Sequence, residues 1–152
     1  MKIFIKIFLI ILVLALFSYK YFIYYDNETG CFIKLKTAIF EPNTVNVKNA
    51  IKTLKYAVPD EYEKLCLNVD TIDPNLSCGG FQGGCYNSHN GNRLIQIGTA
   101  NDDFLGWTAA IIAHETCHAI QFQTNGIEGL EESECYAIGD QVMKTLIDYE
   151  YE

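Results

Sequence analysis

The chain has 152 residues and a formal net charge of −8 at pH 7, and its length suits one domain with a core of its own. Removing the first 25 residues, which contain three lysines and no acidic side chain, leaves 8 basic and 19 acidic side chains. This excess of acids disfavours binding to nucleic acid, and the length leaves no room for a second catalytic domain.

The first 25 residues form an export or anchoring signal. Lys2 and Lys6 supply its positive start, and an unbroken apolar run follows over residues 7–17. Bulky residues come next, where a signal peptidase prefers small ones. We therefore expect residues 1–25 to be an uncleaved membrane anchor and residues 26–152 to be an exported domain. A cleaved signal peptide, which would make the protein secreted, is the alternative.

Two helices are expected early in the exported domain. Apolar residues recur at helical spacing over residues 44–58, and Asn43 or Thr44 can cap this helix. Proline followed by an acidic residue suits the first turn of a second, shorter helix over residues 59–65.

A small sheet is expected next. The segment CLNVDTI, residues 66–72, alternates as a strand does, and the glycine-rich residues 74–84 indicate a loop. The pair Asn90-Gly91 is a strong turn signal, which predicts a β-hairpin whose second strand covers residues 93–98.

Two further helices complete the domain. Residues 103–123 carry apolar side chains around most of the helix circumference, which predicts a helix at the buried centre of the domain. After a turn at Asn125-Gly126, a closing helix is expected over residues 130–149.

The stretch AHETCHAIQ, residues 113–121, lies near the end of the predicted central helix. His114 and His118 are four residues apart, so both imidazoles are expected on one helix face. Convergent histidine nitrogens are typical ligands of tetrahedral zinc. Glu115, rotated by about 100° around the helix, is placed to act as a general base on a zinc-activated water.

The alternative is that three polar residues fall by chance on one turn of a core helix. The flanking residues are apolar or uncharged, and burying two histidines and a glutamate without partners costs several kcal/mol. One metal ion with its water satisfies all three groups, whereas a core helix would need three separate partners. We therefore expect a Zn²⁺ site that also has a third protein ligand.

The motif resembles that of the zincin metallopeptidases. Gln121 and Thr124 stand where the extended metzincin pattern has glycine and histidine, so that branch is excluded. The chain is similar to the gluzincin branch, which pairs His-Glu-x-x-His with a glutamate on a following helix. The resemblance covers residues 111–139 and implies a catalytic zinc held by two histidines and one glutamate.

The segment ESECYAIG, residues 132–139, resembles the Glu-x-Glu-Ala-Asp-x-x-Gly segment of peptidases related to the CAAX-protease and heat-shock membrane metalloproteases. By position, the resemblance makes Glu132 the third zinc ligand, with Glu134 and then Glu131 as alternatives. Tyr136 stands where the family has an aspartate that supports a ligand histidine, so this support is expected to differ. A solvated, acidic first helical turn is the alternative explanation of these glutamates.

The resemblance also implies how a substrate is held. In such enzymes an edge strand before the active-site helix binds the substrate in extended form, and residues 93–98 are expected to play that part. An ordinary sheet edge is the alternative. Tyrosine or histidine commonly stabilises the oxyanion, and Tyr86, Tyr136 and His89 are the candidates. His89 has the alternative of being a solvated turn residue.

Six cysteines follow the signal, and an even number in an exported chain indicates disulfides. Cys117 neighbours a zinc-ligand position and Cys135 follows Glu132, so a disulfide between them would tie the two ligand-bearing helices together. The alternative, Cys117 as a thiolate ligand or nucleophile, conflicts with its direction on the helix. The remaining expected pairs are Cys78 with Cys85 and Cys31 with Cys66.

Taken together, the sequence predicts an α+β fold: a small zincin-like domain with an N-terminal helix, a short sheet, a central helix and a closing helix that carries the third ligand. The expected function is zinc-dependent hydrolysis of peptide bonds in a peptide or protein substrate, at a membrane-tethered site. The alternative function is a disulfide-stapled binding or inhibitory module at the cell surface, with structural zinc or none.

Overall fold

The computed structural model describes residues 2–36, 44–74, 83–87, 93–98, 105–126 and 131–150. Within these ranges the fold is α+β, as the sequence predicts. In chain order the elements are α1 (Lys2–Phe22), β1 (Ile23–Asp26), β2 (Cys31–Leu35), α2 (Thr44–Ala57), α3 (Pro59–Asn68), β3 (Thr71–Pro74), β4 (Gly84–Asn87), β5 (Leu94–Ile97), α4 (Leu105–Asn125) and α5 (Glu132–Glu150).

The strands form one mixed sheet in the order β1-β2-β3-β5-β4. β1 and β2 are antiparallel, β2, β3 and β5 run parallel, and β4 returns antiparallel to β5. The predicted pairing of β5 with a preceding strand is confirmed, although its Asn90-Gly91 turn lies outside the described residues. β5 is interior, because it pairs with β3 on one side and β4 on the other. β4 therefore forms one edge of the described sheet, and β1 forms the other.

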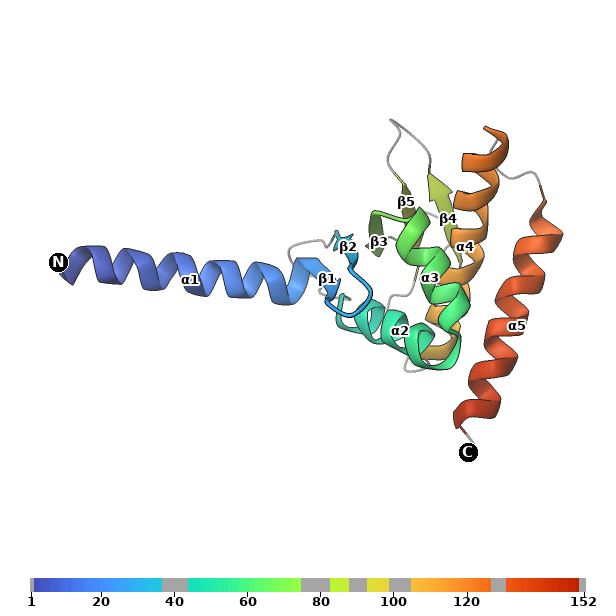
Figure 1. The fold of residues 1–152 in the computed structure, drawn as a ribbon, viewed down its shortest axis with the longest axis horizontal. Coiled ribbons are helices and arrows are strands. Elements are labelled where there is room, and N and C mark those ends of the chain that lie inside the picture. Colours follow the sequence, from blue (N-terminus) through green and yellow to red (C-terminus); the bar gives the residue numbers. More distant parts are fainter. Residues whose placement is uncertain are drawn as a thin grey trace.

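α4 is the buried centre of the domain, as its apolar circumference predicts. It packs against α2, α3 and α5 and against strands β4 and β5. Figure 1 shows α5 as the outermost helix beyond α4, with α1 extending away from the other end of the domain. α4 therefore carries its motif between the edge strand on one side and α5 on the other.

The prediction of a strand over residues 66–72 is wrong in its first part, because α3 continues to Asn68. Leu65 and Val69 are fully buried and four residues apart, whereas Leu67 between them is 63% exposed. The buried side chains thus follow helical rather than alternating spacing, and the strand of this region, β3, begins later.

The β1–β2 hairpin has no counterpart among the predicted elements. It begins at Ile23, directly after α1 and inside the segment expected to be the anchor. On β2, Cys31, Ile33 and Leu35 point into the core and the residues between them are exposed. The hairpin thus joins the apolar N-terminal helix to the core without a linker.

Two of the expected disulfides are present. Cys31 on β2 is bonded to Cys66 on α3, and Cys117 on α4 is bonded to Cys135 on α5, with S–S distances of 1.99 and 2.05 Å. Cys78 lies outside the described residues. Disulfides are typical of oxidising compartments, which suggests an extracellular environment for the domain.

α1 could serve as a signal anchor. Its segment Ile3–Phe22 is 20 residues long, apolar enough to cross a membrane, and buried nowhere within the protein. At 1.5 Å per residue, such a helix spans about 30 Å, the thickness of the hydrocarbon core of a bilayer.

Candidate metal centre

α4 brings the two motif histidines together. The Nε2 atoms of His114 and His118 lie 3.2 Å apart, and both side chains are largely buried. The two rings meet edge to face, with centroids 4.8 Å apart. The four-residue spacing therefore places both imidazoles on one helix face, as the sequence predicts.

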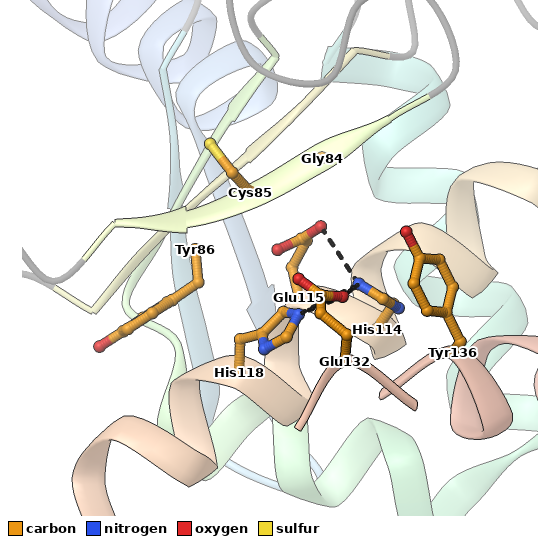
Figure 2. A pocket seen from close by; sticks show the side chains of 8 residues that line it. All are labelled: Gly84, Cys85, Tyr86, His114, Glu115, His118, Glu132 and Tyr136. Carbon is orange, nitrogen blue, oxygen red and sulfur yellow. Dashed lines mark hydrogen bonds and ion pairs between the residues drawn. The ribbon is translucent and has the colours of Figure 1, made fainter. Parts of the chain in front are cut away.

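α5 supplies a carboxylate to the same point. Glu132 Oε2 lies 3.4 Å from His118 Nε2 and 3.6 Å from His114 Nε2, as Figure 2 shows. The three atoms form a nearly equilateral triangle. Glu132 is thus brought to the position that the sequence predicts for a third ligand.

The other two candidate glutamates lie elsewhere. Glu134 accepts a hydrogen bond from Gln121 Nε2 at 3.0 Å through its carboxylate, and Glu131 accepts one from the same nitrogen through its backbone carbonyl. Neither carboxylate is among the groups that line the cavity around the histidines.

His114, Glu115 and His118 form a group that could hold a metal ion, with ligand atoms within 4.8 Å of one another. Glu115 and Glu132 are therefore both candidates for the third ligand. The Oε1 atom of Glu115 lies 3.9 Å from His114 Nε2, farther than the Glu132 oxygen, which is close to both histidines. The shorter distances favour Glu132 as the ligand and leave Glu115 beside the centre.

Glu115 is buried to an unusual degree for a carboxylate. It is 3% exposed, and its Oε2 atom has no hydrogen-bond partner among the described residues. Burial, with the negative charge of Glu132 as a second cause, raises the pKa of Glu115 to about 8, against the opposing effect of a backbone hydrogen bond from Tyr86. Burial also lowers the pKa of the His114 imidazole, with His118 adding to the effect. A nearby cation would stabilise the ionised form of the buried Glu115 carboxylate and would bind the neutral form of the His114 imidazole.

Gln121 contacts the His118 ring on the nitrogen that faces away from the centre. Its Oε1 lies 3.2 Å from His118 Nδ1, and in the tautomer with Nδ1 protonated this contact leaves the Nε2 lone pair directed at the centre. The Cys117–Cys135 disulfide also packs here, with Cys135 Sγ 3.6 Å from the same Nδ1. Sequence reasoning missed Gln121, although its position three residues after His118 on one helix face was a usable signal.

Tyr136 and Tyr86 both line the cavity, but they lie differently. The Tyr136 ring packs against His114 with centroids 4.7 Å apart, so the residue that stands where the resembled peptidases have an aspartate contacts His114 through its ring. In Figure 2 the Tyr86 side chain points away from Glu115 and the histidines. The third oxyanion candidate, His89, lies outside the described residues.

The edge strand beside the centre is β4, not the predicted strand over residues 93–98. β5, which covers most of that segment, has both of its edges paired, so it cannot accept a peptide strand. Gly84, Cys85 and Tyr86 of β4 line the cavity instead. The prediction failed because the strand before the turn, not the one after it, forms the outer edge.

Gly84 allows β4 to pass directly over Glu115. A Cβ atom at this position would lie 2.7 Å from Glu115 Oε1 and 2.8 Å from Ile111 Cγ2. Sequence reasoning did not single out this glycine, which lies among other glycines of a predicted loop.

Gly84→Ala is therefore expected to displace either β4 or the Glu115 carboxylate. The free energy of unfolding should fall by about 1–3 kcal/mol. Any activity that uses Glu115 should fall as well. Denaturant unfolding monitored by circular dichroism measures the first effect. Gly126→Ala is a control for backbone strain without steric overlap, since that glycine has a φ of 71° but open space around it. Unchanged stability and unchanged function in Gly84→Ala would contradict the close approach.

Two cavities meet at the centre. One, of about 260 Å³, is lined by the two histidines and Glu132. The second, of about 290 Å³, is lined by Trp107 and Met143 among others. Both are lined by Gly84, His114, Glu115 and Tyr136, so the two cavities adjoin beside β4, and we call them together the trough.

No family model, no curated protein and no solved structure matches the chain. Fold and site alone therefore define its class: an α+β domain with a candidate metal centre between two disulfide-linked helices.

Proposed function

We propose that this chain is a zinc-dependent peptidase in which His114, His118 and Glu132 bind zinc and Glu115 is the general base. One observation carries the proposal: three potential ligand atoms converge within 3.2–3.6 Å of one another, beside a buried carboxylate that has an oxygen without a partner among the described residues. A structural metal site has no need of that carboxylate, whereas hydrolysis does.

The donor set and its spacing suit zinc. Zinc prefers imidazole nitrogen and carboxylate oxygen at about 2.0–2.1 Å in a tetrahedral arrangement, which places ligand atoms about 3.3–3.4 Å apart. The distances among the two Nε2 atoms and Glu132 Oε2 bracket that value. Three protein ligands leave a fourth position for water or substrate, as catalytic zinc sites require.

When bound, zinc supplies Lewis acidity, which lowers the pKa of a water molecule and polarises a peptide carbonyl. Glu115 then accepts the proton from the attacking water and delivers it to the leaving amine. Gln121 holds the His118 ring in its orientation. Tyr136, which packs on His114 at the cavity wall, is the better placed of the tyrosines to donate a hydrogen bond to the developing oxyanion.

The trough suits an extended peptide. Backbone pairing with the β4 edge would lay a substrate strand across Glu115 and His114, two of the residues that border both cavities. Trp107, Ile111 and Met143 give the second cavity an apolar wall, which favours an apolar substrate side chain beside the cleaved bond.

The domain is proposed to act outside the cytoplasm, tethered by α1. Support comes from the apolar length of α1 and from the two disulfides, which persist in oxidising compartments.

Hydrolysis of a mixed peptide library by the full chain in lipid nanodiscs, followed by mass spectrometry, tests the proposal. We expect cleavage that stops when a chelator removes the metal and returns when zinc is added. Cleavage that persists through chelation would refute zinc catalysis. Binding of zinc without any cleavage would favour the alternative, a cell-surface binding module.

A further inference from the structure

The charges of the chain are segregated along it. Residues 1–58 contain eight basic and three acidic side chains, whereas residues 59–152 contain three basic and sixteen acidic ones. The first part forms α1, the β1–β2 hairpin and α2, and the second forms the rest of the sheet, α3 and the two helices of the metal centre. The basic part of the domain is thus the part next to the apolar N-terminal helix.

Four lysines surround the point where α1 enters the domain, and we call them the basic collar: Lys20, Lys34, Lys36 and Lys48. Lys20 is in the last turn of α1. Lys34 lies opposite Ile23, the residue that directly follows α1, and Lys36 ends the same outward face of β2. Lys48 Nζ donates hydrogen bonds to the backbone carbonyls of Tyr19 and Lys20.

Most of the collar is free to meet a partner. Lys20, Lys34 and Lys36 are exposed, and within the described ranges these three lysines make one ion pair, that of Lys36 with Asp73 at 4.0 Å. By contrast, Lys55 farther along α2 is already paired with Asp26 and Glu28. The collar therefore presents positive charge that the described part of the domain does not neutralise.

An aromatic pair lies beside the collar. Tyr25 and Phe32 face each other across β1 and β2, and they are 45% and 47% exposed. Aromatic side chains with neighbouring lysines are typical of protein surfaces at the headgroup level of a bilayer. The strand order places this hairpin at one edge of the sheet and β4 with the metal centre at the other. Figure 1 shows the same arrangement, with α1 leaving from the hairpin end.

We infer that the basic collar, together with Tyr25 and Phe32, binds the anionic headgroups of phospholipids, so that the domain rests on the membrane with its metal centre turned away. The inference rests on α1 being retained as an anchor, and it is independent of peptidase activity. Charge complementarity and the direct continuity with α1 identify the lipid surface as the partner.

The test uses the full chain in two kinds of nanodisc, one of neutral phosphatidylcholine and one containing about 30% phosphatidylglycerol. Lysines are acylated briefly with an amine reagent, and the extent at each lysine is read by mass spectrometry. Lys34 and Lys36 should react about fivefold more slowly in the anionic discs, and about 0.5 M salt should remove the difference. Lys144, exposed on α5, is the internal control and should react equally in both.

Each other outcome overturns the inference. Equal reaction of Lys34 and Lys36 in both discs would mean that the collar does not touch anionic lipid. Equal protection in both discs would indicate a different partner, such as a second copy of the chain. A chain that does not stay in either disc would remove the anchor and the docking face together.

Discussion

Replacing Glu115 with glutamine is expected to lower kcat for peptide hydrolysis by about 10²–10⁴-fold while the chain keeps its zinc. Glutamine has nearly the same shape and can still accept the backbone hydrogen bond from Tyr86, so β4 has no reason to move. It cannot take a proton from water, however. The loss should therefore fall on the chemical step and not on metal binding.

Steady-state kinetics on one cleaved peptide, with zinc content measured on the same samples, checks this result. Glu63→Gln, exposed on α3, is a matched control and should change neither quantity. Activity equal to that of the parent would eliminate Glu115 as the base. Loss of zinc together with activity would instead make Glu115 a ligand, the role that Glu132 has in the present account.

The three neighbouring glutamates should differ sharply in their effect on zinc affinity. Glu132→Ala removes the oxygen that lies near both histidine nitrogens, so the affinity should fall by more than about 100-fold, beyond the range typical of groups that only orient a ligand. Glu134→Ala removes a partner of Gln121, which in turn orients His118, so a loss below about tenfold is expected.

Glu131→Ala, directly before α5, is the control and should leave the affinity unchanged, because Glu131 contacts Gln121 through its backbone carbonyl. Competition with a chromophoric chelator gives all three affinities on one scale. A larger loss in Glu134→Ala than in Glu132→Ala would exchange the roles of these two residues. Similar losses in all three variants would mean that α5 contributes charge but no ligand.

Local features of the sequence were enough to predict the centre of the fold. The apolar circumference of α4 required burial, and the four-residue spacing of His114 and His118 placed both rings on one face. The disulfide between Cys117 and Cys135 joins two helices, but it was predicted from the position of each cysteine beside a predicted ligand on its own helix, and the structure confirms it. Such features depend on helical geometry, which is set by residues a few positions apart.

Features that depend on distant partners were not predictable in the same way. The edge position of β4 depends on the parallel pairing of β3 with β5, which no local pattern encodes. The β1–β2 hairpin was hidden because its aromatic residues continue the apolar character of the anchor. Gly84 looks like any loop glycine until β4 is seen to cross Glu115. The residues of the candidate metal centre were thus predicted from sequence, whereas the surface that would hold a substrate was not.

The zinc content of the full chain, purified without chelators and measured by mass spectrometry of the metal, tests the central claim most directly. We expect about one zinc per chain, and its loss in His114→Ala. A correctly folded parent chain that binds no zinc even when the metal is supplied would contradict it.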